Sequence, residues 1–115
     1  MSAEKALAAG STPLLLLKLL EERDMYGYEM IETLARRSDD TFSLKAGTLY
    51  PLLHDLEKQG AVRSYDGPSG NRRARRYYSL TGKGRGMLAA KTAEWERFSQ
   101  AVDRVLQGGD VLAFA

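Results

Sequence analysis

The sequence contains no cysteine, only one histidine, and no long uninterrupted apolar run among its 115 residues. Without cysteine the chain can form no disulfide and offers no thiolate to a metal ion, and His54 stands alone without metal-ligand spacing. The longest apolar stretch, Leu14–Leu20, is broken by Lys18 and is too short to span a bilayer, and no signal peptide is visible. We therefore expect one soluble, cytoplasmic domain with no metal, no cofactor and no membrane partner.

Catalytic motifs are also missing. No segment combines a nucleophile, a base and an orienting group, and the acidic residues are scattered among basic ones as surface pairs. The glycine-rich stretch 82–86 lacks the spacing of a phosphate-binding loop in front of a helix. The sequence therefore predicts that the chain is not an enzyme.

Residues 71–86 contain no acidic residue, although the whole chain has a net charge of only +2. A cluster of positive charge of this kind suits a polyanion such as a nucleic acid. A solvated strand whose charges only serve solubility is the alternative, and the run alone does not decide between them. The basic residues of this region are Arg72, Arg73, Arg75, Arg76, Lys83 and Arg85.

Hydrophobic periodicity predicts three helices in the first half of the chain. Ser11, Thr12 and Pro13 suit the entry of a mostly apolar, buried helix over Leu14–Glu22. A turn over Asp24–Gly27 precedes a second helix over Tyr28–Arg37.

The third helix is expected over Lys45–Gln59, where leucines recur at spacings of three and four and Gly60 provides a stop. Pro51 conflicts locally with this helix, because it cannot donate a hydrogen bond. If the leucines face the core, the side chains of Lys45, Thr48, Asp55 and His54 point outward, with Tyr50 near the exposed side.

The second half predicts a β-hairpin and one long helix. Two extended runs, Ala61–Tyr65 and Arg75–Leu80, flank a loop rich in turn residues, and a helix of about 40 Å spans Thr81–Gln107. Three helices followed by a two-stranded wing and a long helix define a mainly α fold with a small β-hairpin, the winged helix-turn-helix. We expect this domain over residues 11–80, the terminal helix over 81–107, and flexible ends over 1–10 and 108–115.

An apolar stripe with a heptad-like spacing follows the terminal helix. A helix that projects beyond a small domain needs a partner for such a stripe, and the same helix of a second copy gives a two-fold dimer. Packing of the stripe on Leu14–Leu20 of the same chain is the alternative. The predicted dimer interface comprises Leu88, Trp95, Phe98, Val102 and Val105, with the polar Lys91 between them.

Three motifs in order resemble the PadR family of transcriptional regulators. Residues 47–53 (GTLYPLL), continuing to LEKQG at 56–60, resemble the recognition helix of that family. Residues 26–29 (YGYE) resemble the opening of its second helix, and residues 75–81 (RRYYSLT) its second wing strand and the start of its dimerisation helix. The resemblance covers about Leu14 to Leu106 and points to the short branch with one C-terminal helix.

The resemblance implies a homodimer that binds a palindromic double-stranded DNA operator, usually as a repressor, and that a small effector releases. Trp95 lies where some members hold flat aromatic compounds between paired tryptophans, so Trp95 and Phe98 become candidate effector contacts, with simple packing as the alternative. The implied DNA contacts are Tyr28, Lys45, Thr48, Tyr50, His54, Arg72, Arg73 and Arg75.

Two residues depart from the family pattern. Lys45 stands where a serine-like cap is usual, and Arg72 stands where the wing commonly has glycine. The main rival function is a winged-helix protein-interaction module that never binds DNA, because a fold does not fix a function. The arginine cluster argues against this rival.

Overall fold

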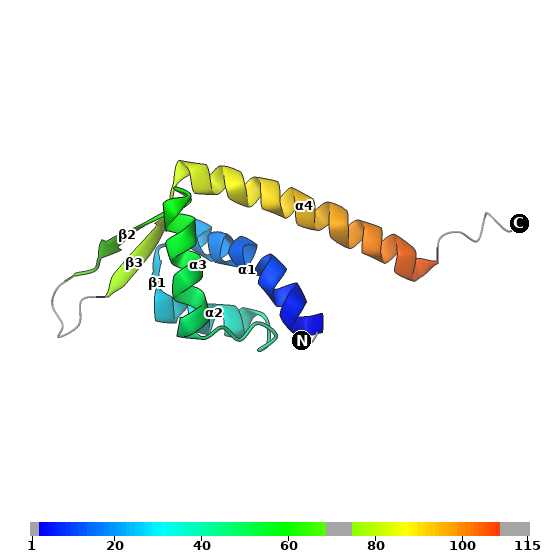
Figure 1. Ribbon diagram of the computed structural model, residues 1–115, viewed down its shortest axis with the longest axis horizontal. Helices are drawn as coiled ribbons and strands as arrows, with labels where there is room; N and C mark the ends of the chain where they lie inside the picture. The colour runs from blue at the N-terminus through cyan, green and yellow to red at the C-terminus, as the bar shows by residue number, and fades with distance from the viewer. Residues whose placement is uncertain (1–2, 69–74, 109–115) are drawn as a thin grey trace, which may run out of the picture.

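The computed structural model describes residues 3–68 and 75–108 of the chain. Its elements follow the order α1 (Ala3–Glu22), β1 (Met25–Tyr26), α2 (Gly27–Arg37), α3 (Ala46–Lys58), β2 (Val62–Asp66), β3 (Arg76–Leu80) and α4 (Gly82–Gln107). Figure 1 shows α1, α2 and α3 grouped beside the strands, whereas α4 runs away from this body as a single long helix. The fold is the expected winged helix-turn-helix with a long C-terminal helix.

The start of the first helix differs from the prediction. Helix α1 begins at Ala3 and contains Pro13, so the expected entry at Ser11–Pro13 is wrong. The alanine-rich sequence ahead of Pro13 has high helix propensity, which offsets the cost of a proline within the helix. The expected flexibility of residues 1–10 and 108–115 stays a prediction.

The sheet also differs, because it has three strands in the order β1-β3-β2. The expected turn over Asp24–Gly27 is wrong at Met25 and Tyr26, which pair antiparallel with Tyr78 and Tyr77 of β3. The hairpin itself is confirmed, with Val62 opposite Leu80 and Asp66 opposite Arg76. A two-residue strand carries too little periodicity to be read from sequence.

The core lies where α1, α2 and α3 meet the inner face of the sheet. Met25 and Tyr78, directly opposite each other on β1 and β3, are both buried on this face. Apolar burial of this kind is the dominant favourable contribution to folding. The buried cluster comprises Leu16, Leu17, Leu19, Leu20, Met25, Met30, Leu34, Leu49, Leu53, Leu56, Ala61, Val62, Tyr78, Leu80 and Leu88.

The junction between β3 and α4 is closely fitted. The Thr81 hydroxyl donates to the Gly60 carbonyl at 2.6 Å and accepts from the Gly84 amide at 3.0 Å, so it caps α4. Gly60 has a φ of +81°, the left-handed conformation expected of a glycine that ends a helix. A Cβ on Gly84 would lie 2.1 Å from the Ala61 carbonyl oxygen, so the start of α4 requires glycine there.

Within residues 3–68 and 75–108, no helix is long and apolar enough to cross a membrane.

Candidate nucleic-acid interface and C-terminal stripe

Helix α3 has two faces with different composition. Leu49, Leu53 and Leu56 are buried, as the leucine spacing predicts. The candidate DNA contacts are exposed on this helix and its cap, namely Lys45, Thr48, Tyr50 and His54. The helix runs from Ala46 to Lys58 through Pro51, and the Lys45 side chain makes no capping hydrogen bond. Lys45 therefore does not cap the helix through its side chain, in agreement with the weak cap expected from the sequence. The Lys45 side chain is exposed at the start of the helix.

Tyr50 joins α3 to the start of α2. Its side chain is 45% exposed, yet its hydroxyl lies so close to Gly27 that a Cβ there would be 2.3 Å from the oxygen. Glycine at position 27 therefore leaves room for the Tyr50 ring, which a larger residue would push aside. Tyr28, the next residue, is 61% exposed, so two tyrosines flank this joint on the surface.

The base of the wing is built from three tyrosines on the outer face of the sheet. Tyr77 on β3 lies between Tyr26 on β1 and Tyr65 on β2, in direct cross-strand register with both. Its ring meets the Tyr26 ring edge to face at 5.5 Å and stacks on the Tyr65 ring at 5.8 Å, measured between centroids. Such aromatic pairs stabilise a sheet beyond simple burial.

Electrostatics distinguish two of the wing tyrosines. The Tyr65 hydroxyl donates to the Asp24 carboxylate at 2.6 Å, and this hydrogen bond raises the pKa of Tyr65 above its ordinary value of 10.0. Burial raises the pKa of Tyr78 on the opposite face. Both phenols therefore stay protonated at neutral pH.

Arg75 is the candidate wing arginine that the structure describes, and it is exposed. Its guanidinium carbon lies 4.6 Å from the centroid of the Tyr26 ring, a cation–π contact. Arg76 is also exposed, at the start of β3 opposite Asp66. Arg72 and Arg73 lie outside the described residues, so their DNA contacts stay a prediction.

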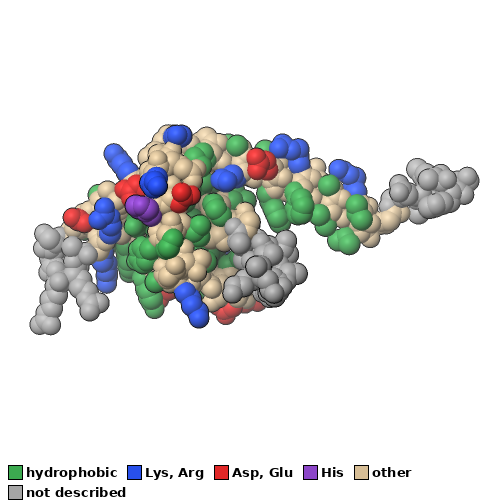
Figure 2. Space-filling model, in the orientation of Figure 1, with side chains coloured by type: hydrophobic (Ala, Val, Ile, Leu, Met, Phe, Trp, Pro, Cys, Tyr) green, Lys and Arg blue, Asp and Glu red, His purple; other side chains and the backbone are tan. Residues whose placement is uncertain are grey.

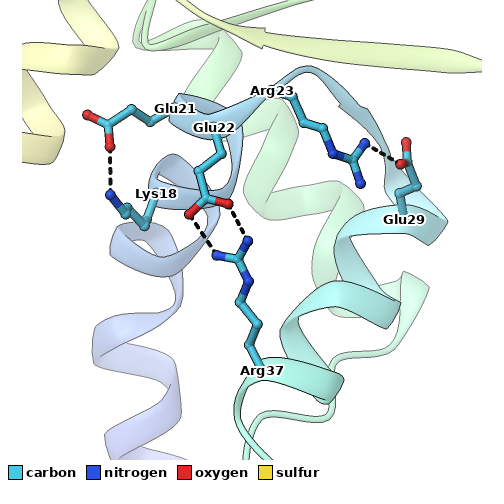
Figure 3. Close-up of polar contacts among 6 residues, drawn as sticks. All are labelled: Lys18, Glu21, Glu22, Arg23, Glu29 and Arg37. Atoms are coloured by element: carbon cyan, nitrogen blue, oxygen red, sulfur yellow. Dashed lines mark hydrogen bonds and ion pairs between the residues drawn. The ribbon is translucent and has the colours of Figure 1, made fainter.

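Other basic residues are engaged in ion pairs at the junction of α1 and α2 (Figure 3). Lys18 donates to Glu21 at 2.8 Å, Arg23 pairs with Glu29, and Arg37 reaches both carboxylate oxygens of Glu22. The hydrogen bond from Arg37 lowers the pKa of Glu22 below its ordinary value of 4.5. The pair of Lys18 lies within α1, whereas the pairs of Arg23 and Arg37 reach α2. All three neutralise charge, whereas Arg75 has no carboxylate partner among the described residues.

Helix α4 carries an exposed apolar stripe beyond the body, which we call the α4 stripe. Figure 2 shows hydrophobic side chains gathered along the lower edge of the projecting helix. Trp95 is 47% exposed and Phe98 54%, and their ring centroids lie 5.9 Å apart. The stripe comprises Trp95, Phe98, Val102, Val105 and Leu106.

Leu88 does not belong to the α4 stripe. It is only 5% exposed and packs in the core of its own chain, so its assignment to a dimer interface is wrong. The reason is its position about two turns after the capped start of α4, where the helix still lies against the body. Leu106, which the heptad-like pattern omitted, is 77% exposed instead.

A cavity of about 260 Å³ separates the stripe from the middle of α1. It is lined by the rings of Trp95 and Phe98 together with Gly10, Ser11, Leu14, Lys91 and Glu94. The candidate effector residues are therefore adjacent to each other, and they lie on a different element from the candidate DNA contacts. The alternative, packing of the stripe on Leu14–Leu20 of the same chain, describes Leu88, which lies in the core cluster. It does not describe Trp95 and Phe98, whose side chains remain about half exposed.

In the part of the chain that the structure describes, no group of three histidine, aspartate or glutamate side chains could hold a metal ion. The structure instead has an exposed polar face on α3, a basic wing, and an apolar arm, the part of α4 that carries the α4 stripe. These features define a winged-helix protein of the DNA-binding type.

Comparison with known proteins identifies the family. The model of the transcriptional regulator PadR-like family matches residues 16–90, and the chain belongs to this family. It is therefore a DNA-binding transcriptional regulator and not an enzyme. A curated relative from Lysinibacillus sphaericus, an uncharacterized protein, is 31% identical over 94 residues, which cover 82% of this chain and 86% of the relative.

Solved structures agree with this assignment. A transcriptional regulator from Clostridium thermocellum superposes with a TM-score of 0.80 at 31% identity, over 86% of this chain and 96% of the other. A PadR family regulator from Eggerthella lenta has a TM-score of 0.78 at 33% identity, over 88% and 86% of the two chains. The sequence resemblance is thus confirmed.

The sequence analysis did not predict that Tyr26, Tyr65 and Tyr77 form one cluster beside Arg75. The signal was present, because Arg75 and Tyr77 are two residues apart and share one face of a strand. The contribution of Tyr26 could not be seen, since it depends on the short strand β1.

Proposed function

We propose that this regulator is a repressor that binds a palindromic operator as a homodimer. The observation that carries the proposal is the joint at residues 26–28, where the wing arginine, the α3 tyrosine and the start of α2 meet. Tyr26 lies under Arg75, Gly27 receives Tyr50, and Tyr28 is exposed beside them. Helix α3 would enter the major groove while the wing lies along the neighbouring backbone.

The division of labour follows from the chemistry of the exposed groups. Lys45 and the wing arginines Arg72, Arg73 and Arg75 suit phosphate oxygens, which set affinity and register. The Thr48 hydroxyl, the Tyr50 hydroxyl and the His54 imidazole suit base edges or sugar-phosphate oxygens. Tyr28 adds a hydroxyl at the start of α2.

Gel shifts with fragments of the promoter region of its own gene test the proposal. We expect a complex whose affinity falls steeply as salt is added, because phosphate contacts release counterions. Exchange of Arg73 and Arg75 for alanine should weaken binding to all sequences and lower the salt slope by about two. Unchanged binding by this double variant would refute the role of the wing. Absence of binding to any genomic fragment at low salt would favour the rival interaction module.

Dimerisation through α4 is part of the same proposal. The α4 stripe exposes two aromatic and three aliphatic side chains on one arm, and a second copy of α4 offers a surface of the same chemistry. A two-fold pair of arms would present two α3 helices and two wings to one duplex. Location in the cytoplasm is included, since the regulator must reach chromosomal DNA.

A small, flat aromatic effector is the third component. The cavity beside Trp95 and Phe98 has the aromatic wall that such a compound needs for stacking. Because Trp95 is the sole tryptophan, quenching of its fluorescence by planar compounds reports binding directly. About one compound per dimer is expected where Trp95 and its counterpart in the second copy flank the same compound. A Trp95→Ala variant that dimerises and still releases DNA fully on addition of the compound would refute this site.

A further inference from the structure

The backbone of Arg75 is held in place at the base of the wing. Its carbonyl accepts a hydrogen bond from the Gly67 amide at 2.7 Å, which continues the pairing one step beyond Asp66 at the end of β2 and Arg76 at the start of β3. A Cβ on Gly67 would lie 2.5 Å from a ring carbon of Tyr77, so this tyrosine closes over the glycine. The arginine therefore starts from a fixed point on the sheet.

The side chain of Arg75 is held as well. Arg75 and Tyr77 share the outer face of the sheet, and Tyr26 lies directly opposite Tyr77. The diagonal neighbour of Arg75 is thus Tyr26, and the guanidinium carbon lies 4.6 Å from its ring centroid. Strand register alone brings the arginine onto the ring.

Tyr26 is itself fixed from three sides. Its ring meets Tyr77 edge to face, its amide donates to the Glu29 carboxylate at 3.3 Å, and its strand pairs with β3. Tyr77 is supported in turn by the stack with the Tyr65 ring. The ring beneath Arg75 therefore has little freedom to move.

A tyrosine ring holds an arginine differently from a carboxylate. A carboxylate occupies the N–H groups of the guanidinium, as Glu22 does for Arg37 and Glu29 for Arg23. A ring covers only the flat face and leaves the N–H edges free to donate. Among the described residues no carboxylate pairs with Arg75, so its donors stay available.

We propose that Tyr26 is a positioning residue for DNA binding, which holds the Arg75 guanidinium with its N–H edge ready for a phosphate oxygen. The inference rests on the proposed DNA contact of the wing. Holding the side chain in advance lowers the conformational entropy lost on binding, so the contact forms more favourably. Tyr26 itself need not touch DNA.

The test uses the full chain and a fluorescein-labelled, mixed-sequence duplex, with affinity measured by anisotropy across a range of salt concentrations. Tyr26→Leu removes the ring face and should weaken binding about threefold, whereas Tyr26→Phe keeps the face and should remain within about twofold of the unaltered protein. Arg75→Ala should weaken binding and lower the salt slope by about one. In the Arg75→Ala background, Tyr26→Leu should have no further effect.

The control is Tyr65→Phe, which breaks the bond to Asp24 without touching Arg75 and should leave DNA affinity unchanged. Additive losses in the double variant, or unchanged affinity in Tyr26→Leu, would overturn the inference and leave the DNA-binding proposal intact. No binding by the unaltered protein at low salt would overturn the DNA-binding proposal itself.

A second variant covers the case in which Tyr26→Leu does not fold, as judged by circular dichroism. Arg75→Lys keeps the charge and all three tyrosines but replaces the flat guanidinium with a compact ammonium. It should weaken binding about threefold at an unchanged salt slope. Affinity equal to that of the unaltered protein would overturn the inference.

Discussion

Large apolar side chains are buried in the body of the molecule and exposed on its C-terminal arm. In the body, most of the described leucines of α1, α2 and α3 are almost completely buried against each other and against the sheet. In the α4 stripe, the exposed fractions of the apolar side chains run from 39% at Val102 to 78% at Val105. The boundary lies within one helix, so secondary structure does not explain the difference.

The difference separates apolar groups that stabilise the fold of one chain from apolar groups that are available for association. The body satisfies its apolar groups within one chain, whereas the arm exposes a contiguous apolar surface of the kind that marks an interaction site. A helix of this length also gains most of its stability from packing rather than from its own hydrogen bonds. Variants in the two regions should therefore change different measurable quantities.

The largest expected effect is on the arm. Phe98→Glu places a charge in the centre of the α4 stripe of each copy and should raise the dimer dissociation constant at least about a hundredfold. The body should remain folded, because Phe98 is already 54% exposed in the single chain. Sedimentation equilibrium measures the first quantity and circular dichroism the second.

The matched control for the arm is Arg97→Glu, which introduces the same carboxylate on the neighbouring residue, outside the stripe. It should leave the dissociation constant within about threefold of the original value. If Phe98→Glu and Arg97→Glu behaved alike, the stripe would not be the interface. The dimeric operator complex would then need another explanation.

The next largest effect is expected at the junction of body and arm. Gly84→Ala should lower the free energy of unfolding by about 2–3 kcal/mol, since its Cβ would meet the Ala61 carbonyl oxygen at 2.1 Å. Gly86→Ala, one half-turn further, meets nothing within 4 Å and should raise it by about 0.5–1 kcal/mol. Denaturant unfolding distinguishes the two. Equal effects would mean that α4 does not lie against Ala61.

Much of the body could be predicted from sequence because its signals are local. Leucine spacing predicted both ends of α3 to within one residue. Helix α4 begins after its cap Thr81 and ends at Gly108, as expected from the sequence. The exposed polar face of α3 followed from the same periodicity. These features depend on residues within a few positions of each other.

The remaining features depend on contacts between distant segments. Strand β1 forms because Met25 and Tyr26 meet β3 more than fifty residues later, and no local pattern encodes that. Burial of Leu88 depends on how far α4 follows the body before it departs. The contact between Tyr26 and Arg75 depends on the pairing of β1 with β3, so it could be seen only in the structure.

A smaller effect is expected in the turn between α2 and α3. Asp39 and Asp40 have φ values of 52° and 64°, the left-handed region that costs an L-residue about 1 kcal/mol. Asp40→Gly removes this cost but gives the unfolded chain more freedom, so we expect a net gain of about 0.5 kcal/mol in unfolding free energy. Thr41→Gly in the same turn, without a positive φ, should destabilise instead. The dimer dissociation constant should not change in either variant.

The smallest effect concerns the ion pair between α1 and α2, which belongs to the body alone. The pKa of Glu22 is lowered by the hydrogen bond from Arg37, so the folded chain binds this proton less readily than the unfolded chain. The stabilisation is therefore present above the ordinary value of 4.5 and is lost as the pH falls through the lower, folded-state value.

Glu22→Gln should accordingly lower the melting temperature slightly near pH 7, and this difference from the original protein should diminish at a pH well below 4.5. Both partners are solvent-exposed, so water screens the pair and the shift stays small. Thermal unfolding at the two pH values measures it, with Glu32→Gln, an exposed carboxylate outside the described ion pairs, as the control. A difference that persists in acid would assign the effect of Glu22 to packing of its side chain rather than to its charge.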